Sequence, residues 1–285
     1  MNDTIATHTY VQLYEFYKKR TEHSNENNRW LFRLKNRSLD RKMSLPESAC
    51  LLLMFQSSRC TSFNKFMELG GARLRQMFPT MPSYANLLKG FRMIEAFVLD
   101  FMNSLLTKPG DRLSLYALDS TKIDSHQAKN WPKSLRREAR AGFTHEGVFF
   151  GFKLHLLCNM NGDVVAVDLS AGSTHDLSPV KGGLLSGIKG IVLGDSGYVS
   201  GAVAGSLRHQ DVALIAKPRP EMMDELWVFK KVWAHIYRKR QRVEGVFNVL
   251  KNSFGLLSRS VRCTAALRSR VWASLAAYCL HKQAS

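Results

Sequence analysis

Apolar residues recur every three or four positions along the first 112 residues, which is the spacing of helices that bury one face. This pattern predicts helices around 10–17, from about 45 to 55, at 62–67, at 73–78 and over 83–106. Ser44 and Glu47 precede the second of them as a capping-box pair, in which Ser44 caps the helix and Glu47 reaches back. The polar stretch at about 21–42 predicts a loop or an arm.

The pattern changes at a cluster of helix-breaking residues, Thr107-Lys-Pro-Gly-Asp111. Beyond it, runs of apolar residues predict strands at 113–119, 148–159, 163–170, 190–194 and 212–216. Helical spacing predicts helices at 177–186, 200–209, 221–236, 238–254 and 264–281. Residues 120–146 are polar and basic. We therefore expect an all-helical N-terminal domain, 1–112, and an α/β domain, 113–285, with a mixed five-stranded sheet flanked by helices.

The net charge of the chain indicates what kind of partner it binds. The 285 residues include 41 Lys and Arg against 23 Asp and Glu, a formal net charge of +18, and 45% of them are apolar. A folded protein with so basic a surface attracts polyanions, and nucleic acid is the leading candidate, although a basic surface can also serve solubility alone. Neither a secretion signal nor a membrane-spanning run is evident, and five scattered cysteines without a Cys-x-x-Cys pair favour reduced thiols. We expect a cytoplasmic protein.

Two aspartates follow apolar runs that predict central strands. Asp119 ends the run from Leu113, and Asp195 ends the run from Gly190. Either one alone is readily explained as a turn residue. Together they suggest a site, because α/β proteins place their sites at the carboxyl ends of such strands. Clustered carboxylates repel one another and attract a cation, and oxygen ligands favour Mg²⁺ or Mn²⁺.

A third carboxylate lies on the expected late helix. At 100° per residue, Tyr237, Arg240, Glu244 and Lys251 fall within an arc of roughly 60° beside an apolar stripe. A solvated helix face can look the same. Beside two strand-end aspartates, however, Glu244 is better interpreted as a metal ligand. Arg240 could then hold Glu244 in place, and Lys251 could bind a phosphate.

Four further residues are weaker candidates. Lys122 follows Asp119 closely and could contact a phosphate. Lys153 and His155 share one face of their strand, where they either contact a phosphate or cap the edge of the sheet. In Thr174-His-Asp176, His175 could approach DNA, but Asp176 is well placed to cap the following helix, and capping is the preferred interpretation.

These motifs resemble those of a known family. Asp119-Ser-Thr-Lys, Gly147-Val-Phe-Phe-Gly-Phe-Lys-Leu-His155, Gly194-Asp-Ser-Gly-Tyr198 and the Tyr237, Arg240, Glu244, Lys251 row are similar to DDE transposases of bacterial insertion sequences, with insertion-sequence family 982 as the nearest branch. The order of strands and helices is also that of ribonuclease-H-like folds. One departure is Ser196, where the family pattern leads us to expect Lys.

The resemblance implies a ribonuclease-H-like DDE catalytic domain with two Mg²⁺ ions, replaceable by Mn²⁺, held by Asp119, Asp195 and Glu244. It implies double-stranded DNA as partner, both terminal inverted repeats and target DNA. For that DNA, the contacts that we expect are Lys122, Lys153, His155, Tyr237, Arg240 and Lys251. Residues 1–112 would bind the repeat, and a homodimer on DNA and a place at the bacterial nucleoid are expected. Two alternatives stay open: a catalytically silent DNA-binding protein, and a ribonuclease-H-like nuclease that cuts without joining.

Overall fold

The structure is a computed structural model that describes residues 3–22, 43–124, 138–144, 147–216, 230–256, 261 and 263–284, and among 230–237 the side chains of His235 and Ile236 only. The chain forms two compact units. The first contains the described residues up to Leu105 and from Leu250 onward, and the second contains those between. The predicted stretch at 21–42 lies almost wholly outside the described residues, as do 221–229.

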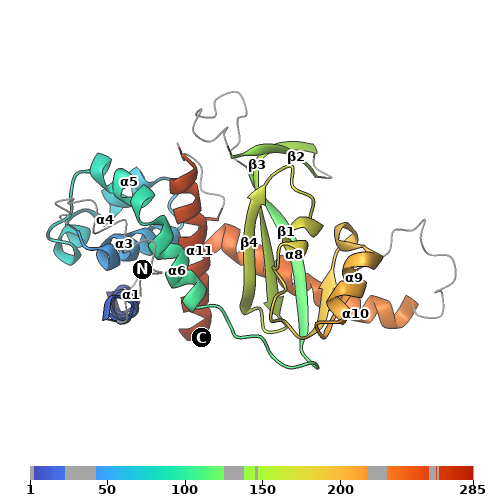
Figure 1. The fold of residues 1–285 in the computed structure, drawn as a ribbon. Coiled ribbons are helices and arrows are strands. Elements are labelled where there is room, and N and C mark those ends of the chain that lie inside the picture. Colours follow the sequence, from blue (N-terminus) through green and yellow to red (C-terminus); the bar gives the residue numbers. More distant parts are fainter. Residues whose placement is uncertain are drawn as a thin grey trace. The chain divides into compact units, whose positions relative to one another are not determined.

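The first unit is helical (Figure 1). Its helices are α1 (Asp3–Glu22), α3 (Leu45–Ser57), α4 (Phe63–Met77), α5 (Tyr84–Met93), α6 (Glu95–Ser104) and α11 (Thr264–Ala284). Helix α3 is apolar on all sides and nearly every one of its residues is buried, as expected of a central helix. The capping box is confirmed, since Ser44 Oγ accepts from the Glu47 amide and Glu47 Oε2 accepts from the Ser44 amide.

Two helix boundaries in this unit differ from the prediction. The long helix expected over 83–106 is divided at Ile94, where the backbone leaves helical angles, so that α5 and α6 result. Conversely, the two short helices expected at 62–67 and 73–78 are joined in α4 across a kink at Gly71, whose φ of 36° suits a residue without a Cβ.

Helix α11 changes the expected domain boundary. It packs with α3, α5 and α6, and it is buried without interruption from Val271 to Leu280. The hydroxyl of Ser269 donates to the Phe91 carbonyl at 2.7 Å, and Gln56 donates to the Arg270 carbonyl at 2.9 Å. The C-terminal helix therefore belongs with the N-terminal helices, and the α/β unit ends near Val249 instead of at 285.

The second unit is a mixed sheet of six strands. The strands are β1 (Leu115–Asp124), β2 (Arg140–Thr144), β3 (Gly147–Asn159), β4 (Val164–Ala171), β5 (Gly190–Gly194) and β6 (Val212–Ala216). The order is β2-β3-β1-β5-β6, with β4 also paired to β3. β1 pairs antiparallel with β3 and parallel with β5, and β5 pairs parallel with β6. The sheet is mixed as predicted, but β2 makes it one strand larger.

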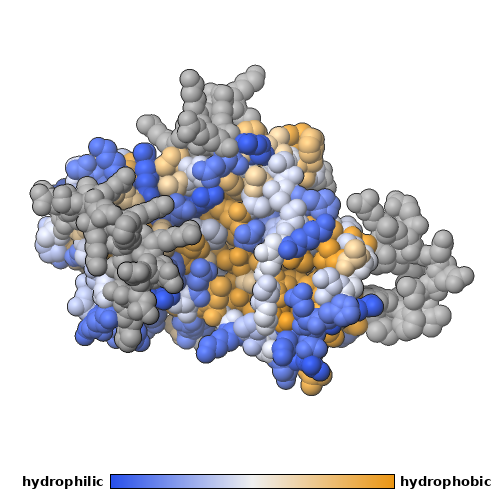
Figure 2. Space-filling view, viewed as in Figure 1, coloured by the Kyte–Doolittle hydropathy of each residue, from blue (hydrophilic) through white to orange (hydrophobic). Residues whose placement is uncertain are grey.

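Helices lie on both faces of this sheet (Figure 1). The short α8 (Leu177–Lys181), the 3₁₀ turn η2 (Ser196–Tyr198) and α9 (Gly201–Arg208) contribute to one core, whose central members from the sheet are Tyr116, Leu118, Leu157 and Val192. On the other face runs α10 (Lys230–Ser253), with Val243, Val246 and Phe247 buried. Figure 2 shows apolar residues gathered over β4, the edge strand.

The predicted connections of the sheet are largely confirmed. The hairpin turn at Met160-Asn161-Gly162 joins β3 to β4, with Gly162 at a φ of 88°. Helix α8 is shorter than the helix expected at 177–186, because the chain turns at Gly182 and Gly183. All five cysteines are free: Cys50, Cys60, Cys158, Cys263 and Cys279.

Candidate active site

Asp119 and Asp195 occupy matching places on the two central strands. The parallel pairing of β1 with β5 ends at Ala117 and Leu193, and each aspartate comes two residues later. The two carboxylates are therefore neighbours where the strands separate. One prediction needs correction here: β1 does not end at Asp119 but continues to Asp124, because β3 keeps pairing with it on the other side.

The Asp119 carboxylate is half-buried, with 21% of its side chain exposed. Its Oδ1 accepts from the Ser120 amide at 2.8 Å, and its Oδ2 accepts from Arg240 at 2.9 Å. Burial raises the pKa of Asp119 to about 6, and the charge of Asp195 adds to this rise. The Arg240 charge and the Ser120 amide oppose it. A carboxyl that is costly to ionise beside a second carboxyl is typical of a functional site.

Arg240 connects Glu244 to the same place. One end of its guanidinium, Nη1, donates to Asp119 Oδ2, and the other, Nη2, donates to Glu244 Oε1 at 2.5 Å. The expectation that Arg240 holds Glu244 agrees with this geometry. Asp119 is thus linked to Glu244 through Arg240 and lies near the charge of Asp195. No group of three or more His, Cys, Asp or Glu side chains in the described parts of the chain is spaced to hold a metal ion. The cation between Asp119 and Glu244 here is a guanidinium.

The remaining residues of the expected DNA-binding set occupy different surroundings. Lys251 lies on α10 seven residues after Glu244. The side chain of Tyr237 lies outside the described residues. Lys122 is half-buried on β1, and since it is three residues from Asp119 its side chain points to the other face of the sheet.

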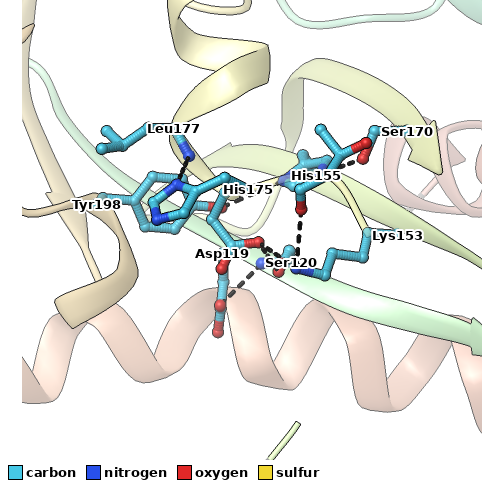
Figure 3. A network of polar contacts seen from close by, with 10 residues as sticks. Asp119, Ser120, Lys153, His155, Ser170, His175, Leu177 and Tyr198 are labelled. Atoms are coloured by element: carbon cyan, nitrogen blue, oxygen red, sulfur yellow. Dashed lines mark hydrogen bonds and ion pairs between the residues drawn. The ribbon is translucent and has the colours of Figure 1, made fainter. Parts of the chain in front are cut away.

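The structure contradicts the expectation that His155 contacts DNA. His155 is fully buried, with Nε2 2.8 Å from the Ser170 hydroxyl and Nδ1 3.4 Å from the Tyr198 hydroxyl (Figure 3). Burial lowers its pKa to about 4, so that the ring is neutral near pH 7. Lys153 is on the same face, with 14% of its side chain exposed, and it donates to Asp176 and to the Thr174 carbonyl.

The expectation that Asp176 caps a helix is also wrong. Asp176 stands at the N-cap position of α8, but its side chain makes no bond to that helix. Instead, the ring of His175 accepts from the Leu177 amide at 3.2 Å, as Figure 3 shows. The Asp176 carboxylate accepts from the Ser120 hydroxyl and from Lys153. Sequence reasoning missed this network because Ser120, Lys153 and Asp176 are far apart in the sequence, by 56 residues between Ser120 and Asp176, and come from β1, from β3 and from the start of α8.

The fold is a mixed α/β domain, consistent with a ribonuclease-H-like domain, with acidic residues on or just after its central strands and on a late helix. Comparison with protein families identifies it further. Residues 110–260, more than half of the chain, match the family described as transposase DDE domain, and the chain belongs to that family. This membership supports a transposase that acts on DNA.

No curated protein matches the chain. In the part of the chain that the structure describes, the helices are all too short or too polar to cross a membrane.

Proposed function

We propose that the chain is an active DDE transposase of a bacterial insertion sequence, of the family 982 branch. It would bind the terminal inverted repeats, cleave the element's ends by phosphodiester hydrolysis and join the freed 3′ hydroxyl to target DNA. The observation that carries this proposal is the half-buried Asp119 carboxyl, whose pKa is raised to about 6 with the charge of Asp195 adding to the rise, and which Arg240 links to Glu244. Membership of the transposase DDE family supports it.

The three side chains fit divalent ions by their chemistry. All the donors are carboxylate oxygens, which suit Mg²⁺ and Mn²⁺ better than zinc. A nearby positive charge stabilises the ionised form of the half-buried Asp119 beside Asp195. In the structure Arg240 supplies part of that charge. Asp119, Asp195 and Glu244 would hold two ions, whose chemistry is the activation of a water or a 3′ hydroxyl and the stabilisation of the leaving oxygen.

The chain's other residues position the DNA. Arg240 orients Glu244 through the bond between Nη2 and Oε1. Lys122, Tyr237 and Lys251 are proposed to contact phosphates or bases of the bound end. The N-terminal helices would bind the terminal repeat, and the net charge of +18 supports a long phosphate backbone as partner. Two ends must be joined, so we propose a homodimer on DNA, in the bacterial cytoplasm at the nucleoid.

Cleavage of the element's own ends tests this proposal. Labelled DNA carrying both ends is incubated with Mg²⁺ or Mn²⁺ and with the intact protein, Asp119→Ala or Glu244→Ala. We expect metal-dependent nicking at the ends by the intact protein and a loss of at least about 1,000-fold in both variants, since removal of a metal ligand removes the charge that stabilises the transition state. Retained DNA binding by both variants is the control for folding.

The two alternatives give different results in the same assay. A catalytically silent DNA-binding protein would bind the ends tightly without nicking them in either metal. A nuclease without joining activity would nick the ends but would not insert pre-cut 3′ ends into a target plasmid. Joining of pre-cut ends by the intact protein, and not by Asp119→Ala, supports the transposase.

A further inference from the structure

The carboxylate of Asp176 lies directly behind the first metal-ligand candidate. Its Oδ1 accepts from the hydroxyl of Ser120 at 3.2 Å, and Ser120 is the residue whose amide donates to Asp119. The same Oδ1 forms an ion pair with Lys153 Nζ at 3.1 Å. Lys153, on β3, also donates to the Thr174 carbonyl at 3.0 Å, which ties it to the turn that carries Asp176.

The other oxygen of Asp176 faces Gly197, in the turn that follows the second metal-ligand candidate, Asp195. A Cβ placed on Gly197 would meet Asp176 Oδ2 at 3.0 Å, which is closer than side-chain carbons normally approach. Gly197 is two residues after Asp195, in the 3₁₀ turn whose first amide donates to the Asp195 side chain. One carboxylate therefore borders both the residue after Asp119 and the turn after Asp195.

Buried polar contacts continue this connection. The Tyr198 hydroxyl, from the same turn, lies 3.4 Å from His155, and His155 in turn lies 2.8 Å from the Ser170 hydroxyl. His155 and Tyr198 are both buried. A buried network whose members all have partners keeps its elements in one arrangement. Here it joins β3 and β4 to the turn that follows β5.

Helix capping does not explain Asp176, because His175 accepts from the first turn of α8 in its place. We propose that Asp176 is a positioning residue: together with Lys153 it fixes the residue after Asp119 against the turn after Asp195, and so sets the spacing of these two carboxylates for the metal ions. This inference rests on the proposed function. Residues that orient metal ligands from behind typically change metal affinity or activity by about 10–100-fold when they are replaced.

Direct Mn²⁺ binding tests the inference without depending on catalysis. Free Mn²⁺ is measured by electron paramagnetic resonance during titration of the full-length protein without DNA. Asp176→Asn keeps the shape of the side chain and removes its charge. We expect its Mn²⁺ dissociation constant to rise by about 10-fold, and the Mn²⁺ concentration for half-maximal nicking to rise equally, while the rate at saturating Mn²⁺ recovers most of its wild-type value.

The control is Asp211→Asn, which removes an exposed ion pair of the same unit, that of Asp211 with Arg112 at 2.9 Å. It is expected to bind Mn²⁺ like the wild type. If Asp176→Asn fails to fold, Gly197→Ala decides, because its added carbon presses the Asp195 turn against the Asp176 carboxylate while keeping the Asp176 side chain itself; it should also weaken Mn²⁺ binding by about 10-fold. Gly205→Ala, in α9 with nothing within 4 Å of the added carbon, is its control.

Each outcome is decisive. Equal Mn²⁺ affinity in folded Asp176→Asn and in the wild type would overturn the positioning role and leave the proposed function standing. Wild-type protein that binds no Mn²⁺, or binds it as well after Asp119→Ala, would contradict the proposed metal site itself, and the inference would fall with it. The positioning role of Asp176 is supported if Asp176→Asn binds Mn²⁺ more weakly than the wild type and Asp211→Asn does not, while the two variants have equal thermal stability.

Discussion

Arg240 donates to Asp119 at 2.9 Å across 121 residues of sequence, from a late helix to the first strand of the sheet. Only 16% of the Arg240 side chain and 21% of the Asp119 side chain are exposed. A half-buried ion pair of this kind contributes little net stability, because the loss of hydration offsets the attraction between the charges. Its value is in placement, since it sets the helix that carries Glu244 against the strand that carries Asp119.

Replacing the Asp119 carboxyl should stabilise the protein at neutral pH. Its folded pKa of about 6 exceeds the ordinary value of 3.8, so ionisation above pH 6 costs the folded state about 3 kcal/mol. Asp119→Asn removes this cost, and we expect it to raise the free energy of unfolding by up to about 3 kcal/mol at pH 7.5 and not at pH 3.5. Urea unfolding at both pH values measures this difference. Equal or lower stability at pH 7.5 would contradict the raised pKa.

The Asp119→Asn variant should lose stability in acid more steeply than the wild type, because of His155. Its folded pKa of about 4 lies below the ordinary 6.5, so the folded state resists protonation and loses stability as the pH falls from 6.5 to 4. In the wild type Asp119 gains stability over nearly the same range, because its folded state takes up the proton first. We expect a flatter pH profile of unfolding in the wild type than in Asp119→Asn between pH 6.5 and 4. Parallel profiles would contradict this.

Removing Arg240 should shift the pH at which metal binds. The Arg240 charge lowers the pKa of Asp119, so Arg240→Gln should raise that pKa further. Metal binding requires the ionised carboxylate, so the midpoint of the pH dependence of Mn²⁺ binding is expected to move upward by about one pH unit. Arg112→Gln, which removes another ion pair of the α/β unit, is the control and should leave the midpoint unchanged.

The elements that the sequence predicted best were those in which local signals agreed. The turn at 160–162 and the capping box of α3 were confirmed, because their residues determine the backbone directly. Strand β2 was missed because Arg140-Ala-Gly-Phe-Thr144 lies in a polar, basic stretch and pairs only along one edge of β3. The packing of α11 with the N-terminal helices was missed, because apolar spacing predicts that a helix is buried but not which elements it packs against.

In the site, too, local patterns suggested some residues, whereas the contacts of others depend on the fold. Asp119, Asp195 and Glu244 were proposed as metal ligands from strand and helix patterns, and that assignment stays a prediction; the structure places the charge of Asp195 near Asp119 and pairs Glu244 with Arg240. The roles of Asp176 and His155 were not predictable. Asp176 sits where a helix cap is expected, and only the fold shows that its side chain turns to Ser120 and Lys153 instead. Alternation placed His155 on one face of β3, but not which layer would bury that face.

Loss of the Ser44 cap should weaken the helical unit. Ser44→Ala removes the hydroxyl that accepts from the Glu47 amide, and we expect a loss of about 1 kcal/mol in the free energy of unfolding. Ser83→Ala is a matched control, because Ser83 precedes α5 without a side-chain bond to it. Denaturant unfolding followed by circular dichroism compares the two. An equal effect of both substitutions would mean that the capping bond does not contribute.

Two glycines of the α/β unit should respond to alanine in opposite directions. A Cβ on Gly151 in β3 would lie 2.1 Å from the Ile123 carbonyl oxygen, a backbone atom that is fixed by the pairing of β1 with β3. Gly151→Ala must therefore push apart the strand that carries Asp119, and a loss of about 3 kcal/mol or more is expected. Gly205→Ala meets nothing within 4 Å inside α9, and it should gain up to about 1 kcal/mol. Thermal unfolding of both variants measures the contrast; a stable Gly151→Ala that still nicks DNA at the wild-type rate would contradict the close pairing of β1 and β3 on which the site depends.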